Sequence, residues 1–110
     1  MDLQTRKCKP CEKGATPLSS DREEALLSNI KNWELTRTGI HRLKKRFIVH
    51  SFSAAMGFVV QIGLVAETQG HHPNICIFYD KVDVELYTHS VNGLSENDFI
   101  VAARIDHILK

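Results

Sequence analysis

The spacing of apolar residues along this chain predicts three helices and two β-hairpins. The first helix is expected over residues 20–31, where Ser20 and Glu23 have the spacing of a capping box. Its apolar positions recur at helical spacing, and they are Leu26, Leu27, Ile30 and Trp33. This periodicity predicts a short amphipathic helix with one face available for packing.

Alternation of apolar and polar residues predicts the two hairpins. The expected strands are residues 33–36 and 43–49 in the first hairpin, and residues 74–79 and 82–89 in the second. Gly39 suits the first turn because it adopts a positive φ at little cost, and Asp80 and Lys81 form the second turn. In the last strand one face holds Val82, Val84, Leu86 and Thr88, and the other holds Asp83, Glu85, Tyr87 and His89. Cys76 is expected to be a small buried residue.

Two further helices follow the two hairpins. Ser51 is the expected N-cap of a helix that runs to about Gln69, and Gly70 suits the left-handed position that ends it. Its expected inner stripe is Phe52, Met56, Val59, Gly63 and Ala66, broadened by Ala55, Ile62 and Leu64. A helix this apolar is expected to pack against the sheet and against another subunit. Ser95 caps the last helix, whose apolar stripe is Phe99, Ala102, Ala103, Ile105 and Ile108.

This order of elements predicts an α+β fold, with one four-stranded antiparallel sheet and three helices on one of its faces. The chain has 110 residues, which is enough for one small domain. Residues 1–18 are polar and contain Pro10, Gly14 and Pro17, so we expect an N-terminal arm there. Residues 19–110 then form a single domain.

Composition and charge exclude several classes of function. The net charge is +1, so there is no strong electrostatic reason to expect direct binding to nucleic acid or to a membrane surface. The N-terminus lacks the apolar segment of a signal peptide, and no apolar run approaches the ~20 residues of a membrane span. The chain has three cysteines, an odd number, and no export signal, so a disulfide framework is not expected. A reducing cytoplasm is the expected location.

Candidate chemistry is concentrated where the predicted elements begin and end. Histidine exchanges protons near neutral pH, because its unperturbed pKa is about 6.5. His71 and His72 follow the second helix, and His89 ends the last strand. Asp98 stands at N3 of the last helix, while Glu67 lies one turn before His71 and is expected to orient that imidazole. If the helix end and the strand end converge, these groups share one cleft.

Each of these residues also has a purely structural explanation. Taken alone, the pair His71 and His72 is more simply a helix end with surface histidines, and His89 an exposed histidine at a strand end. Asp98 at N3 is accounted for by the free amides of the first turn. Glu67 is equally well explained as a solvated helix residue.

A metal site is a weaker alternative. Cys8 and Cys11 have the spacing of half a zinc site, but no second pair follows. The three clustered histidines lack the i,i+3 or i,i+4 pairs of helical metal sites, so a catalytic metal ranks below acid–base use. The spacing leaves the role of the two cysteines open.

The residues together resemble the signature of the pterin-4a-carbinolamine dehydratases. The matching motifs are Glu67-x-x-x-His71-His72-Pro73, Tyr79, Thr88-His89 and Gly93-Leu94-Ser95-x-x-Asp98. Cys8-x-x-Cys11, Pro17-Leu18, Trp33 and the segment 97–104 are similar to bacterial members. The likeness covers nearly the whole chain, and the combined motif is specific whereas its separate pieces are not.

This resemblance implies an activity and a set of site residues. Members dehydrate 4a-hydroxytetrahydropterin to quinonoid dihydropterin, which recycles the tetrahydrobiopterin-type cofactor of aromatic amino-acid hydroxylation. The implied catalytic residues are His71, His72, His89 and Asp98, with the largest roles at His72 and His89. The implied substrate-binding residues are Glu67, Gly70, His71, His72, Pro73, Tyr87, Thr88, His89 and Ser90. No metal or bound cofactor is implied.

The same resemblance implies partners and leaves an alternative open. Members assemble as homodimers or homotetramers, and a phenylalanine hydroxylase is the expected metabolic partner. The animal member also serves as a dimerisation cofactor of a homeodomain transcription factor. A non-catalytic binding, assembly or coactivator module on the same fold is therefore the alternative function. A metal-dependent hydrolase is a third hypothesis, which predicts stoichiometric metal in the purified protein.

Overall fold

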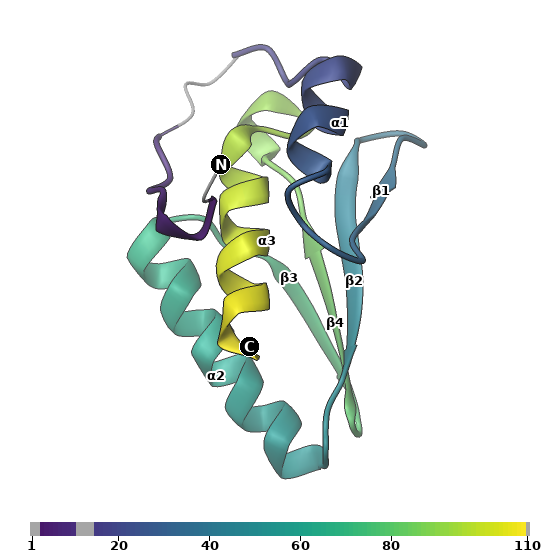
Figure 1. Cartoon of the computed structure of the whole chain (residues 1–110), viewed down its shortest axis with the longest axis vertical. Helices are drawn as coiled ribbons and strands as arrows, with labels where there is room; N and C mark the ends of the chain where they lie inside the picture. The colour runs from purple at the N-terminus through teal and green to yellow at the C-terminus, as the bar shows by residue number, and fades with distance from the viewer. Residues whose placement is uncertain (1–2, 11–14, 110) are drawn as a thin grey trace.

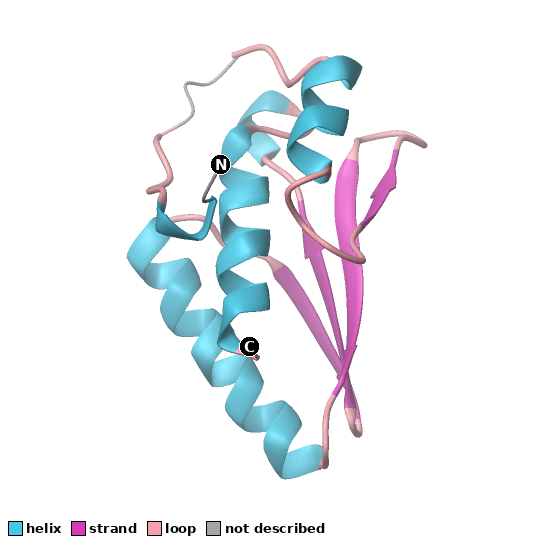
Figure 2. Ribbon diagram, viewed as in Figure 1, coloured by secondary structure: helices cyan, strands magenta, loops and turns pink. Residues whose placement is uncertain are grey.

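The computed structural model describes residues 3–10 and 15–109 and shows one antiparallel sheet with its helices on one side (Figures 1 and 2). Its elements are η1 (Leu3–Thr5), α1 (Ser20–Leu27), β1 (Glu34–Thr36), β2 (Arg42–Ile48), α2 (Phe52–Gln69), β3 (Asn74–Phe78), β4 (Lys81–Leu86), η2 (His89–Val91) and α3 (Glu96–Ile108). The strand order is β1-β2-β4-β3, with every neighbouring pair antiparallel. The predicted α+β fold, with its two hairpins and three α-helices, is confirmed.

The core lies between this sheet and the helices. Strand β4 is central and alternates as predicted, so that Val82, Val84 and Leu86 are buried against the helices. Helix α3 is buried along most of its length, and Phe99 and Ile105 are fully inaccessible to solvent. Burial of this apolar surface is the main driving force for folding. No helix of the described residues is both long enough and apolar enough to cross a membrane.

Helix α2 buries only part of the set of residues that was expected to face inward. Its buried residues are Ala55, Phe58, Ile62 and Ala66. Four residues of the predicted stripe or its neighbours are exposed instead, and they form one ridge at i,i+4 spacing: Phe52, Met56, Val60 and Leu64. The helix is apolar on both sides, so periodicity alone does not select the face that meets the sheet.

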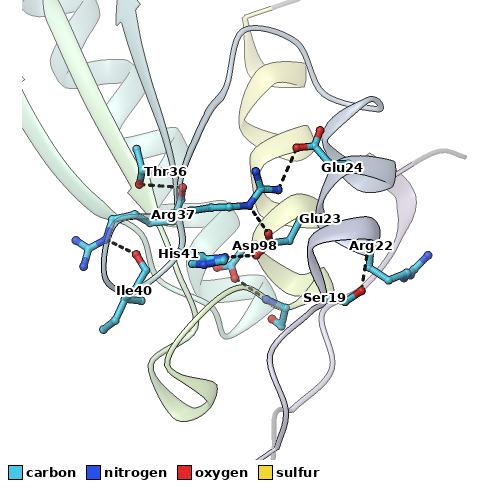
Figure 3. A network of polar contacts seen from close by, with 11 residues as sticks. Ser19, Arg22, Glu23, Glu24, Thr36, Arg37, Ile40, His41 and Asp98 are labelled. Atoms are coloured by element: carbon cyan, nitrogen blue, oxygen red, sulfur yellow. Dashed lines mark hydrogen bonds and ion pairs between the residues drawn. The ribbon is translucent and has the colours of Figure 1, made fainter.

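Helix α1 begins at Ser20, as predicted, but ends at Leu27, sooner than predicted. Ser19 is its N-cap, with the hydroxyl accepting a hydrogen bond from the Arg22 amide at 3.3 Å, so the expected capping box of Ser20 and Glu23 is wrong. Glu23 is fully buried and pairs with Arg37 at 3.0 Å and with His41 at 2.7 Å (Figure 3). A buried carboxylate needs such partners, which here link α1 to the connection between β1 and β2.

The end of strand β4 also differs from the prediction. The strand stops at Leu86, and His89 opens the short helix η2 instead of ending the strand. A tight loop follows, in which the Thr88 amide donates to the Gly93 carbonyl at 2.7 Å and Asn92 adopts a left-handed φ of 54°. This loop turns the chain back toward α3.

The outer face of the sheet is solvent-exposed and carries mostly polar side chains, together with exposed Ile48 and Phe78. Cys76 belongs to this face and is exposed, so the expectation of a buried thiol is wrong. Its register partner on β4 is Asp83, which lies on the polar side of that strand. Strand alternation therefore decides the exposure of Cys76, because its apolar neighbours Ile75 and Ile77 point to the opposite face.

Glu85 on this outer face is expected to make stability depend on pH. Partial burial raises the pKa of Glu85, but hydrogen bonds from Asn74 and Arg42 lower it more, so the net pKa lies below the ordinary 4.5. A carboxyl group with a lowered folded-state pKa stabilises the fold above its unfolded pKa and loses that effect as the pH falls. Glu85→Gln is expected to cost about 0.5–1 kcal/mol at pH 7 and close to nothing at about pH 3.

Urea unfolding of wild type and Glu85→Gln at both pH values checks this expectation. Glu34→Gln is the matched control, because Glu34 is an exposed glutamate of the same sheet, on the edge strand β1. An equal loss of stability for Glu85→Gln at both pH values would contradict the expectation that ionised Glu85 stabilises the fold.

Candidate active site

A cavity of about 570 Å³ opens where the end of α2, the segment from β4 to η2 and the N-terminal residues meet. Seven of the predicted site residues line it, namely Gly70, His71, His72, Tyr87, Thr88, His89 and Ser90. Glu67 and Pro73 are not part of the lining, and Asp98 lies behind it, fully buried. The helix end and the loop after β4 therefore converge, which brings the three histidines to one cavity.

The end of helix α2 aims the first two histidines. Gly70 takes the left-handed conformation with φ 64°, and the His71 amide donates to the Ala66 carbonyl at 3.2 Å. This cap reverses the chain direction at a residue without a Cβ, where other residues are strained. Pro73 then favours an extended backbone at His72, which leads into β3.

His71 is held by a buried carboxylate. Its Nε2 lies 2.6 Å from Oδ1 of Asp98, and only 12% of the His71 side chain is exposed. Asp98 Oδ2 accepts from the Thr88 hydroxyl at 2.7 Å and from the Ser95 amide at 2.9 Å. A carboxylate accepts hydrogen bonds, so this contact favours the His71 tautomer that carries its proton on Nε2.

Thr88 and Ser95 complete a chain of hydrogen bonds behind the cavity. The two hydroxyl oxygens lie 2.7 Å apart, and Thr88 has only one proton to give. Since Thr88 donates to Asp98, the Ser95 hydroxyl donates to Thr88. Asp98 therefore has two structural roles, because it forms a capping box with Ser95, the predicted N-cap, and orients His71.

His72 and Glu67 form a separate pair at the rim. Glu67 Oε1 lies 2.8 Å from His72 Nε2, and both side chains are largely exposed. The expected contact of Glu67 with His71 is wrong, because Asp98 occupies the Nε2 side of His71. His89 is exposed on η2, so the three histidines surround one cavity with different degrees of burial.

Five residues that the sequence did not indicate also line the cavity. They are Cys8, Lys9, Pro10, Gln69 and Asn97. Three of these come from the expected N-terminal arm. Cys8 and Asn97 belong to segments that resemble bacterial family members, but no site role was expected for them. Within residues 3–10 and 15–109 no group of three or more His, Cys, Asp or Glu side chains is placed to hold a metal ion. Cys11, the second cysteine of the half zinc motif, lies outside the described residues.

Comparison with known proteins identifies the family. Residues 16–108 match the family described as pterin 4 alpha carbinolamine dehydratase. The chain belongs to this dehydratase family. A relative from Methylococcus capsulatus that carries the dehydratase name is 40% identical over 106 residues, which cover 96% of this chain and 92% of the relative. Another, from Nitrosomonas europaea, is 40% identical over 110 residues, covering 99% of this chain and 95% of the relative.

Two solved structures of the dehydratase fold are also similar. A transcriptional coactivator/pterin dehydratase from Brucella melitensis has a TM-score of 0.81 and 32% identity, and the match covers 86% of this chain and 100% of that one. A pterin dehydratase-like protein described as a RuBisCO assembly factor in the alpha-carboxysome has a TM-score of 0.60 and 26% identity. That second match covers 70% of this chain and 88% of the assembly factor.

Proposed function

We propose that this protein dehydrates 4a-hydroxytetrahydropterin to quinonoid dihydropterin and water. The observation that carries the proposal is the gathering of His71, His72 and His89 around one cavity, with His71 paired to buried Asp98. Membership of the dehydratase family supports the same reaction. Perturbable groups collected in a cleft are typical of a functional site.

The reaction needs one acid and one base. The acid protonates the departing 4a-hydroxyl as its C–O bond breaks, and the base takes the N5 proton as the C4a=N5 double bond forms. Imidazoles supply both roles near neutral pH, each typically worth ~10²–10⁴-fold in rate. We assign the largest roles to His72 and His89, because both are exposed to the cavity while His71 is committed to Asp98.

The remaining groups position these histidines and the substrate. Asp98 fixes the ring of His71 and balances charge that develops on it, and Glu67 holds His72. The backbone of residues 70–72 and 87–90 offers donors and acceptors to the edge of a pterin. Pro73 directs the backbone after His72. The proposal assigns no metal and no bound cofactor to this site.

The proposed setting is the recycling of a tetrahydrobiopterin-type cofactor in the cytoplasm, beside a phenylalanine hydroxylase. We further propose a homodimer or homotetramer. The exposed ridge of Phe52, Met56, Val60 and Leu64 on α2 supports association, because an apolar face of this kind is unfavourable in water.

The decisive test is turnover of freshly generated 4a-carbinolamine, followed by ultraviolet absorbance. Wild-type protein is expected to accelerate dehydration well above the spontaneous rate. Folded wild-type protein without any acceleration would contradict the proposed function.

A non-catalytic assembly or coactivator module is the second candidate. The similarity to a RuBisCO assembly factor favours it, and so does the exposed apolar ridge on α2. This alternative predicts that binding to a protein partner is undiminished by His72→Ala and that the wild type shows no turnover. Both measurements together separate the two functions.

A further inference from the structure

The N-terminal residues run along α3 and are anchored there. Leu3 is 1% exposed and belongs to the hydrophobic core. The Arg6 guanidinium pairs with Glu96 at the start of α3, and Arg104 donates to the Arg6 carbonyl from Nε at 3.1 Å. Figure 1 shows this segment lying beside α3 and near the C-terminal end of α2. Residues 3–10 are therefore part of the folded structure.

Two side-chain amides at the cavity hold the last residues of this segment. Gln69 Oε1 accepts from the Cys8 amide at 2.9 Å. Asn97 accepts from the Lys9 amide at 2.9 Å through Oδ1 and donates to the Lys9 carbonyl at 2.6 Å through Nδ2. Asn97 is 8% exposed, so these bonds are shielded from competing water.

The positions of the two amides connect the segment to the catalytic groups. Gln69 directly precedes Gly70 and the two histidines, while Asn97 directly precedes Asp98. The two helices that adjoin His71, His72 and Asp98 thus also fix the backbone of Cys8 and Lys9. Cys8, Lys9 and Pro10 form the wall of the cavity that neither α2 nor the loop after β4 supplies.

We propose that residues 8–10 are a wall of the substrate site and that Gln69 and Asn97 are positioning residues that determine substrate affinity. The proposal rests on the dehydratase function proposed above. The wall contacts bound substrate but carries none of the proposed acid–base groups. A contact present equally in the ground state and the transition state changes KM and leaves kcat unchanged.

Gln69→Ala and Asn97→Ala test the proposal. Each is expected to raise KM for the carbinolamine about five- to tenfold, as the loss of one or two hydrogen bonds predicts, with kcat within about twofold of wild type. Gln69→Glu keeps the acceptor for the Cys8 amide and is expected to restore KM. Gln61→Ala is the matched control, because Gln61 is exposed on the same helix and does not line the cavity.

Hydrogen exchange of the Cys8 and Lys9 amides provides a readout that does not depend on turnover. Both amides are expected to be protected in wild type and to exchange faster in the corresponding variant. Faster exchange with an unchanged KM in both variants would overturn the proposal that residues 8–10 form a wall of the substrate site. A fall in kcat without a rise in KM would overturn it too. Wild-type protein with protected amides and no turnover would instead contradict the proposed function.

Discussion

His89→Ala is expected to lower kcat/KM for the 4a-carbinolamine by about 10²–10³-fold while the fold survives, in line with the worth of a positioned acid or base. His89 is exposed on η2, so its removal leaves no cavity in the core and no buried partner unsatisfied. The loss therefore reports chemistry and not stability. His72→Ala is expected to have an effect of similar size, because His72 is equally exposed to the substrate cavity.

Steady-state kinetics and thermal unfolding of the same samples check this result. His50→Ala is the matched control, since His50 is an exposed histidine that does not line the cavity. Its activity is expected to equal that of wild type. Full activity in both His72→Ala and His89→Ala would refute histidine acid–base catalysis at this site, even if the dehydratase activity itself were present.

Asp98→Asn is expected to have the second-largest effect. It should lower kcat by about 10–100-fold, because His71 loses its charged partner. This loss is smaller than the full contribution of an acid or base group. The substitution should also lower the free energy of unfolding by about 1–3 kcal/mol, since an amide NH₂ in this fully buried position must face groups that are themselves donors. In the wild type, the Asp98 carboxylate accepts hydrogen bonds from His71, Thr88 and Ser95.

Nitrogen NMR of the histidine rings separates orientation from a general loss of structure. Wild type is expected to show His71 protonated on Nε2, and Asp98→Asn to lose this preference while the rings of His41 and His107 keep their signals. Asp21→Asn is the matched control, because Asp21 occupies the exposed first turn of α1. An unchanged His71 ring together with unchanged kcat would show that Asp98 serves only as a helix cap.

Local sequence predicted the elements and much of the site. Gly70 ended α2, Ser95 capped α3 and Asp98 stood at its N3 position, as predicted, because these features depend on residues within one turn of each other. The alternation in β4 placed Val82, Val84 and Leu86 in the core. The motif from Glu67 to Asp98 indicated the family, and the histidines it contains do surround one cavity.

The two errors about carboxylate partners share a physical cause, which is that the deciding contact comes from a distant part of the chain. Glu23 is three residues from an expected capping partner but is drawn to Arg37 and His41. Glu67 bonds His72 because Asp98, from another helix, already holds His71.

By itself, the sequence determined where most helices and strands form and placed the candidate histidines at their ends, since propensity, capping and periodicity act over a few residues. Only the tertiary structure decided which face of the apolar helix α2 meets the sheet. It also decided which carboxylate orients which imidazole, and that residues 8–10 line the cavity. These outcomes depend on competition among partners far apart in sequence, and packing settles that competition only when the whole core forms.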